Sequence, residues 1–190
     1  TWDEVRSEAE RIGYPVVLKA EAPTLVHKTE VGGVVLDLVD EATLKAAYDG
    51  LSDKLSGTPE LAFLLQKQLS GGVEVIVGGA RAPGLGATVM FGLGGIHVEL
   101  LKDVVFKLAP VSEPEADAML DGIRTAPLLQ GYRGRPAVDR PALRDCLLRT
   151  SRLLADFPQI EELDLNPVIV AEEGGVTAVV DARIKLSDPQ

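Results

Sequence analysis

The sequence is poor in aromatic residues and in cysteine. Aromatic side chains make up 4% of its 190 residues, so a core must be built from aliphatic side chains. The single cysteine, Cys146, excludes an intramolecular disulfide and fits a reducing compartment. It lies among leucines at helical spacing, which favours a buried structural thiol over a reactive one.

The chain also lacks an excess of positive charge and a long apolar run. Its formal net charge of −10 argues against non-specific nucleic-acid binding but leaves room for a local phosphate site. No run approaches the roughly 18–20 apolar residues that span a bilayer, and the start of the sequence carries no signal-peptide pattern. We therefore expect a cytoplasmic protein with neither a nucleic-acid nor a membrane partner. Because the sequence does not begin with methionine, we also expect it to be a piece of a longer chain.

Apolar residues at spacings of three and four predict helices at four places. Capping patterns precede them at Thr1 with Glu4, at Asp40, at Ser112 with Glu115 and at Asp139. The predicted helices cover residues 2–12, the segment from Asp40 to Leu55, the segment from Ser112 to Ile123, and residues 141–156.

Short runs rich in aliphatic residues predict strands. They cover residues 15–20, 33–39, 61–65, 73–77, 87–91, 104–108, 163–170 and 176–184. Glycine-containing turns at 70–72 and 82–84 predict antiparallel hairpins in the middle third of the chain. Helices mixed with mainly antiparallel strands indicate the α+β class.

Lys19 closes the first strand ahead of a loop that contains Lys28, Thr29, Gly32 and Gly33. Two glycines let successive backbone N–H groups turn toward an anion, and lysine and threonine add side-chain donors. The spacing is not that of a P-loop. The alternatives are a cation that meets a phosphate and a lysine whose head reaches solvent at the strand end.

A second glycine-rich turn contains Gly92, Gly94 and Gly95. It resembles a dinucleotide fingerprint only superficially, because the third glycine is misplaced, and a hairpin turn is the alternative. Lys102 and Asp103 follow, and Glu99 lies just before them, so we expect charges beside any ligand held there.

Alternation along the strand at 163–170 places Asp164 and Asn166 on one face, away from the leucines between them. The following strand carries Asp181, which an adjacent position would bring beside Asn166. Carboxylate and amide oxygens suit Mg²⁺, which takes phosphate oxygens as its remaining ligands. The local alternative is a turn at Asn166-Pro167.

His27 is one of two histidines and stands beside Lys28. It is either an incidental loop residue or a nucleophile, since neutral imidazole can accept a phosphoryl group and pass it on. No zinc-type cluster and no serine triad is recognisable.

The residues together resemble the nucleotide-binding part of NDP-forming acyl-CoA ligases, such as ADP-forming acetate–CoA ligase. The resemblance covers nearly the whole chain. It is carried by the segments at 16–19, 27–34, 71–75, 90–99, 101–104, 127–134 and 162–170.

The resemblance implies an ATP-grasp fold, whose two lobes would cover residues 1–65 and 66–190 and hold ATP or ADP with Mg²⁺. It implies that Lys19 reaches the phosphates, with Lys28, Gly32 and Gly33 nearby. The backbone of the segment with Gln66, Gln68 and Leu69 would pair with adenine, and Glu74 would lie near the ribose. Asn166 and Asp181 match metal positions, with Asp164 beside them. His27 matches a histidine that carries phosphate, and Gly94 and Gly95 belong to a characteristic block.

The resemblance also implies a partner, an acyl-CoA-binding alpha subunit or fused domain that carries the primary catalytic histidine. Residues that normally precede the first helix of such a domain are missing, so we expect a fragment that cannot complete the acyl-CoA reaction alone. Two alternatives remain: a non-catalytic module of a protein lysine acetyltransferase, and a different ATP-grasp ligase. The residues do not specify the acid or the choice between ATP and GTP.

Overall fold

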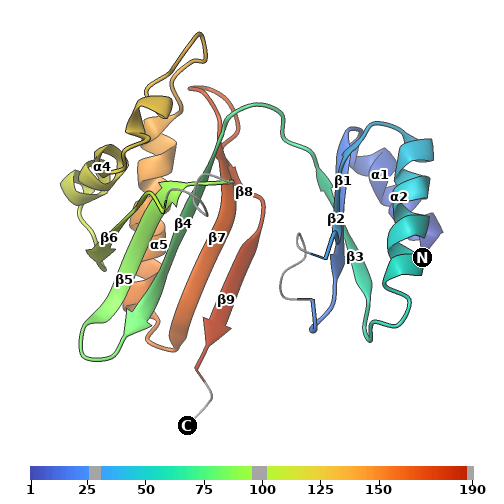
Figure 1. The fold of residues 1–190 in the computed structure, drawn as a ribbon, viewed down its shortest axis with the longest axis horizontal. Helices are drawn as coiled ribbons and strands as arrows, with labels where there is room; N and C mark the ends of the chain where they lie inside the picture. The colour runs from blue at the N-terminus through green and yellow to red at the C-terminus, as the bar shows by residue number, and fades with distance from the viewer. Residues whose placement is uncertain (26–30, 96–101, 188–190) are drawn as a thin grey trace. The chain divides into compact units, whose positions relative to one another are not determined.

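A computed structural model describes residues 1–25, 31–95 and 102–187 of the chain. The chain divides into two compact units, Thr1–Ser70 and Gly71–Gln190. Each unit is an antiparallel sheet with helices on one of its faces (Figure 1). This confirms the expected α+β class. Within the described ranges, no helix has the length and apolarity needed to cross a membrane.

The first unit has a three-stranded sheet in the order β2-β1-β3. Its elements are α1 (Trp2–Ile12), β1 (Val16–Glu21), β2 (Val34–Leu38), α2 (Glu41–Lys54) and β3 (Ala62–Lys67). Val16 and Leu18 point from β1 toward the helices and pack with Val5, Ala9 and Leu44. The expected capping residues begin both helices, Thr1 with Glu4 at α1 and Asp40 at α2.

The second unit has a six-stranded sheet in the order β6-β5-β4-β7-β8, with β9 also paired to β7. Its strands are β4 (Val73–Ala82), β5 (Gly86–Leu93), β6 (Val104–Leu108), β7 (Ile160–Val170), β8 (Ala178–Val179) and β9 (Ala182–Leu186). Its helical segments are α4 (Glu113–Gly122), η1 (Ala126–Leu128) and α5 (Arg140–Asp156).

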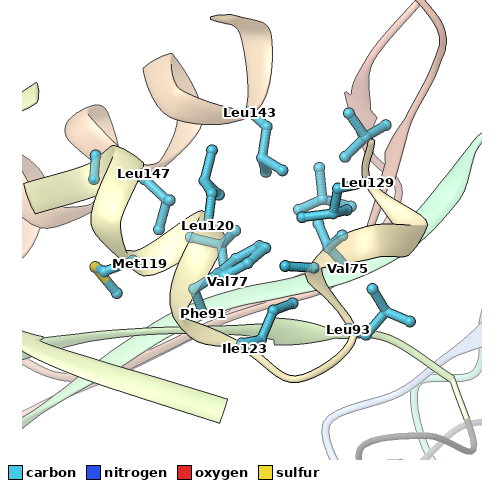
Figure 2. Packing of buried hydrophobic residues seen from close by; sticks show 14 of the residues in the cluster. Val75, Val77, Phe91, Leu93, Met119, Leu120, Ile123, Leu129, Leu143 and Leu147 are labelled. Carbon is cyan, nitrogen blue, oxygen red and sulfur yellow. The ribbon is translucent and has the colours of Figure 1, made fainter. Parts of the chain in front are cut away.

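The main core lies between this sheet and the helices α4 and α5 (Figure 2). Phe91 is its largest fully buried side chain, and aliphatic residues surround it, as the low aromatic content requires. Cys146 packs half-buried at the edge of this core, where burial raises the pKa of its thiol. A raised thiol pKa disfavours the reactive thiolate, in agreement with a structural role.

The glycine turn at 70–72 does not form the expected hairpin. β3 pairs with β1, whereas β4 pairs with β5 and β7, so the two strands belong to different sheets. The division between the units falls after Ser70, five residues beyond the expected boundary at 65/66, because β3 continues to Lys67 along β1. The second expected hairpin, between β4 and β5, is present.

The strand expected at 176–184 is two short strands, β8 and β9, both paired to β7. Val180 N donates to Pro167 O at 3.1 Å, but proline has no N–H to return a hydrogen bond at this point. Asp181 lies at the resulting break between the two strands.

Gly79 lies on β4 where the sheet approaches α5. A Cβ atom there would overlap the carbonyl oxygen of Thr88 and Cδ1 of Leu154. We expect Gly79→Ala to lower the free energy of unfolding by about 1–3 kcal/mol, the usual cost of overpacking. Gly50→Ala is the contrasting variant, since nothing lies within 4 Å and helix propensity should stabilise by about 0.5–1 kcal/mol. Urea denaturation measures both, and an unchanged midpoint for Gly79→Ala would refute the clash.

Candidate functional site

The face of the second sheet that points away from α4 and α5 carries the predicted metal residues. Val75 and Val77 of β4 point into the core, so alternation directs Ile76 and Gly78 to the opposite face. The register places Gly78 beside Met90 of β5 on one side and Asp164 of β7 on the other. We call this surface the open face.

Three residue pairs on β7 and the segment from Asp181 to β9 form a charged ladder on the open face. Glu162 is paired with Lys185, and Asp164 with Arg183. One step further, Asn166 N donates to Asp181 O at 3.1 Å. The ladder therefore gathers three carboxylates, one amide, one guanidinium group and one ammonium group in neighbouring positions, and the expected adjacency of Asn166 and Asp181 is confirmed.

Asn166 and Pro167 lie inside β7, so the alternative of a local turn is wrong. The β4–β7 ladder has an irregularity here, where Val75 and Val77 are paired with Val168 and Leu165. Two residues of β7 therefore stand opposite Ile76, as in a β-bulge. Bulges of this kind tolerate proline and redirect side chains beside functional sites.

The electrostatics of the ladder centre on Asp164. Desolvation by the surrounding residues raises its pKa, Arg183 opposes this, and Asp181 and Glu162 add to the rise. A carboxyl group in this setting gains from a bound cation, because the cation relieves the repulsion between neighbouring carboxylates. Lys185, at the far end of the ladder, forms an ion pair with Glu161 at 2.8 Å.

A shallow hollow of about 380 Å³ covers this part of the open face. Its apolar side is formed by Ile76, Met90 and Phe106, and its polar side by Asp164, Asn166 and Arg183, among others. Gly78 packs closely against β7 here, because a Cβ atom there would lie 2.8 Å from Leu163 O and 3.7 Å from Asp164 Oδ1.

The donor set fits a magnesium ion that is shared with a ligand. Among residues 1–25, 31–95 and 102–187, no group of three or more His, Cys, Asp or Glu side chains gathers as a metal site. Mg²⁺ commonly uses one or two carboxylates and fills its other positions with water and phosphate oxygens. Asp181, the amide of Asn166 and the adjoining Asp164 match that mode better than they match an all-protein cage.

Glu74 lies beside the glycine-rich turn that contains Gly94 and Gly95, although the two are about twenty residues apart in the sequence. Gly94 N donates to Glu74 O at 2.7 Å, and a Cβ atom on Gly94 would lie 3.1 Å from Cβ of Glu74. Gly95 has a positive φ of 69°, and Glu74 Oε2 would lie 3.5 Å from its added Cβ. The absence of side chains at these glycines thus leaves room for exposed Glu74.

Lys19 lies in the middle strand of the first sheet, on the face away from the helices. Its side chain is only 7% exposed. A lysine whose head reaches bulk solvent would not be buried, so the solvent-seeking alternative is wrong. Burial of a lysine requires compensation for its charge.

The predicted adenine-binding segment lies at the outer edge of β3. Gln68 N donates to Pro15 O at 3.1 Å, and Gln66 is paired with Val17. Because hydrogen-bonded positions alternate along an antiparallel pair, the backbone groups of Gln66 and Gln68 face β1, and those of Lys67 face outward. The segment was expected to pair with adenine through its backbone. The register leaves this role to the outward-facing backbone groups of Lys67 and of the next outward position, Leu69.

Side chains of this segment hold the first unit together. Gln68 accepts a hydrogen bond from Asp37 N and donates one to Asp37 Oδ1, both at 2.7 Å. Lys67 Nζ donates to Gly13 O at 2.9 Å and to Tyr14 O at 2.7 Å. The Lys67 and Gln68 side chains are thus engaged within the unit.

Several predicted residues lie outside the described residues: His27, Lys28 and Glu99. Of the loop glycines, Gly32 has a positive φ of 60°, which suits the expected turn. Gly33 is buried, and its carbonyl oxygen accepts a hydrogen bond from Ala20 N at 2.7 Å.

Asp103 is not a ligand-facing charge, contrary to the expectation from its place after the glycine turn. It is 7% exposed and accepts hydrogen bonds from Arg124 N, Thr125 N and Thr125 Oγ1 at 2.8, 2.8 and 2.6 Å. These bonds fasten the segment after α4 to the start of β6. Asp103 therefore has a structural role, whereas exposed Lys102 remains at the surface.

Arg183 is the site residue that the sequence reasoning missed. The signal was available, because Asp181, Arg183 and Lys185 alternate on one strand face just as Glu162, Asp164 and Asn166 do.

Two α+β units with antiparallel sheets, one of which presents a metal-type donor set on its open face, define an ATP-grasp domain. A family model described as an ATP-grasp domain matches residues 1–186. The subunit beta of ADP-forming acetate–CoA ligase II from Pyrococcus furiosus is 40% identical over 191 residues, which cover 98% of this chain and 81% of that subunit. The chain belongs to this family, the ATP-grasp part of ADP-forming acyl-CoA ligases.

Longer relatives and solved structures agree with this assignment. ADP-forming 4-hydroxybutyrate–CoA ligase from Nitrosopumilus maritimus is 43% identical, and the match covers 96% of this chain but 27% of that enzyme. Acetyl-coenzyme A synthetase 1 of Candidatus Korarchaeum cryptofilum, solved with coenzyme A and Ca-AMPCP, superimposes with a TM-score of 0.92 at 41% identity. That match covers 98% of this chain and 82% of the solved chain.

Proposed function

We propose that the chain is the nucleotide-binding part of an ADP-forming acyl-CoA ligase, which binds Mg²⁺ with ATP or ADP and exchanges phosphate with a histidine. The observation that carries the proposal is the ladder on the open face, where Asp164, Asn166 and Asp181 lie together. The same Korarchaeum synthetase is also known with Mg-AMPPCP and with its phosphohistidine segment pointing towards the nucleotide-binding site, which supports this function.

In this proposal each group has a distinct task. Asp181 and Asn166 hold Mg²⁺, with Asp164 beside them, and the ion neutralises phosphate charge as the phosphoryl group moves. Lys19, a buried residue, binds nucleotide phosphate through its ammonium group. The outward backbone groups at Lys67 and Leu69 pair with adenine, and Glu74 lies near the ribose with Gly94 and Gly95 beside it.

The proposed partner is an acyl-CoA-binding part that carries the primary catalytic histidine. The Pyrococcus relative is named as a beta subunit, whereas the Nitrosopumilus relative is a longer single chain. Both forms are consistent with a partner that is either a separate alpha subunit or a fused domain. We further propose a cytoplasmic location, which the single cysteine supports.

His27 would accept phosphate from the partner's phosphohistidine and pass it to ADP. This role comes from the family resemblance, and it stays a prediction because His27 lies outside the described residues. The alternative, a non-catalytic module of an acetyltransferase, is disfavoured by the relatives, which are named as ligases or a CoA synthase.

The proposed function is tested with the purified protein, its acyl-CoA-binding part and ATP labelled in the γ-phosphate. We expect label that is released by acid and survives base, the behaviour of phosphohistidine, and calorimetric binding of Mg-ATP. Parallel titration with Mg-GTP determines the base preference. His27→Ala should abolish label on this chain while leaving Mg-ATP binding intact. Absence of Mg-ATP binding would favour the non-catalytic alternative, and unchanged turnover in His27→Ala would exclude only the covalent role of His27.

A further inference from the structure

Arg183 occupies a defined place beside the proposed metal residues. Its register partner is Asp164, and the next pair in the ladder is Asn166 with Asp181. Residues that are paired across antiparallel strands share a face, so all four side chains are directed to the open face. Arg183 and Asn166 are diagonal neighbours, a separation of about 7–8 Å between Cα atoms that long side chains can bridge.

The guanidinium group of Arg183 is available for a ligand. Among the described parts of the chain, Arg183 forms no ion pair and no side-chain hydrogen bond, although it lines the same hollow as Asp164 and Asn166. The neighbouring cation, Lys185, is already bound to Glu161 at 2.8 Å. The two cations of β9 thus differ, although they stand two residues apart on one face.

Arg183 is placed to help an anion bind beside a metal ion. A bound Mg²⁺ ion would balance the carboxylates of Asp164 and Asp181, which leaves Glu162 as the further carboxylate of the hollow near Arg183, since Lys185 is bound to Glu161. A guanidinium group presents parallel N–H donors that match two phosphate oxygens, which a lysine ammonium group cannot reproduce.

We propose that Arg183 binds the terminal phosphate of the nucleotide, the β-phosphate of ADP or the γ-phosphate of ATP, beside the metal ion. Arg183 thereby favours nucleoside di- and triphosphates over monophosphates. This inference rests on the proposed function of the open face and adds a residue that determines its specificity.

The test is calorimetric titration of the purified protein with Mg-ADP, Mg-ATP and AMP. In Arg183→Met, which keeps an apolar stem, we expect the Kd for Mg-ADP and Mg-ATP to rise about 10- to 100-fold, as for the loss of a charge-assisted contact, and the Kd for AMP to stay unchanged. The Kd of Arg183→Lys for Mg-ADP and Mg-ATP should lie between those of the parent and Arg183→Met, because lysine keeps the charge and loses the two-donor geometry. Arg149→Met is the control, because Arg149 is an exposed arginine of α5, on the other side of the sheet, that pairs with Asp145 at 2.7 Å; it should bind all three nucleotides like the parent.

The outcomes separate the inference from the proposed function. If the parent protein binds neither Mg-ADP nor Mg-ATP, the proposed function fails. If the parent binds them and Arg183→Met binds them equally well, the role of Arg183 is wrong and the function stands. An equal loss for AMP and Mg-ADP would also overturn the inference, because it would show a general disturbance of the site. Thermal unfolding of Arg183→Lys and Arg183→Met shows whether the fold is retained.

Discussion

Replacement of Asp181 by alanine is expected to weaken Mg²⁺-dependent nucleotide binding by about 100-fold or more. Asp181 is paired with Asn166 and adds to the negative field at Asp164, so it stands at the centre of the donor set. In the alanine variant the proposed Mg²⁺ site lacks the Asp181 carboxylate. The amide of Asn166 and the neighbouring carboxylate of Asp164 remain. Asp181→Asn should lie between the parent and the alanine variant, since an amide oxygen can still coordinate but carries no charge.

The metal dependence makes this measurement specific. Titrations with ATP are run with Mg²⁺ and with EDTA, and the variant should differ from the parent only when Mg²⁺ is present. Glu173→Gln is the matched control, because it removes an acid from the exposed turn between β7 and β8 and should bind like the parent. Parent-like Mg-ATP affinity in Asp181→Ala would contradict the proposed metal site. Equal losses with EDTA would mean that Asp181 supports the fold of this edge rather than the ion.

The shared face of Asp164 and Asn166 on β7 could be predicted from the sequence, because side-chain alternation along a strand is a local property. Successive residues of a strand point to opposite faces, so Asp164 and Asn166 had to share a face wherever the strand was placed. Buried Leu163 and exposed Asp164 follow this rule in the structure. The same rule applied to residues 181–185 would also have identified Arg183.

Which strands pair with one another could not be predicted from local alternation. The glycines at 71 and 72 have positive φ values of 78° and 83°, which suit a hairpin turn and a connection between units equally well. Which of these forms depends on distant pairings, such as β4 with β7, that bring residues about ninety positions apart into contact. A local signal therefore located the turn but not the sheets on either side of it.

The role of Asp103 likewise depends on contacts with residues that are distant in the sequence. Its position after a glycine-rich turn suggested a ligand-facing charge, but its hydrogen-bond donors are Arg124 and Thr125, about twenty residues further along the chain. Burial acts to raise the pKa of Asp103, but the hydroxyl of Thr125 and the two backbone N–H groups outweigh it and hold the pKa below its ordinary value. Asp103 thus stabilises the folded state, and its contribution to the free energy of unfolding can be measured.

Asp103→Ala should lower the free energy of unfolding by about 3–4 kcal/mol, because three part-buried donors lose a charged acceptor. Asp103→Asn isolates the charge, and its effect should depend on pH. Since the folded state lowers the pKa of Asp103, the ionised group stabilises fully above its unfolded pKa of about 3.9. That stabilisation is lost as the pH falls through the lower folded value. The difference between the parent and Asp103→Asn in urea denaturation should therefore be constant above about pH 5 and shrink at lower pH.

Asp145→Asn provides the control for this experiment in the same unit. Asp145 lies on α5 and pairs with Arg149 at 2.7 Å, with both side chains more than half exposed. Loss of such a surface pair should cost about 0.3–0.5 kcal/mol. A pH-independent difference for Asp103→Asn would mean that the carboxylate charge contributes nothing and that the hydrogen-bond geometry alone holds the segment. A difference that grows toward low pH would place the pKa of Asp103 above its ordinary value and contradict the assignment, because burial would then dominate the three hydrogen bonds.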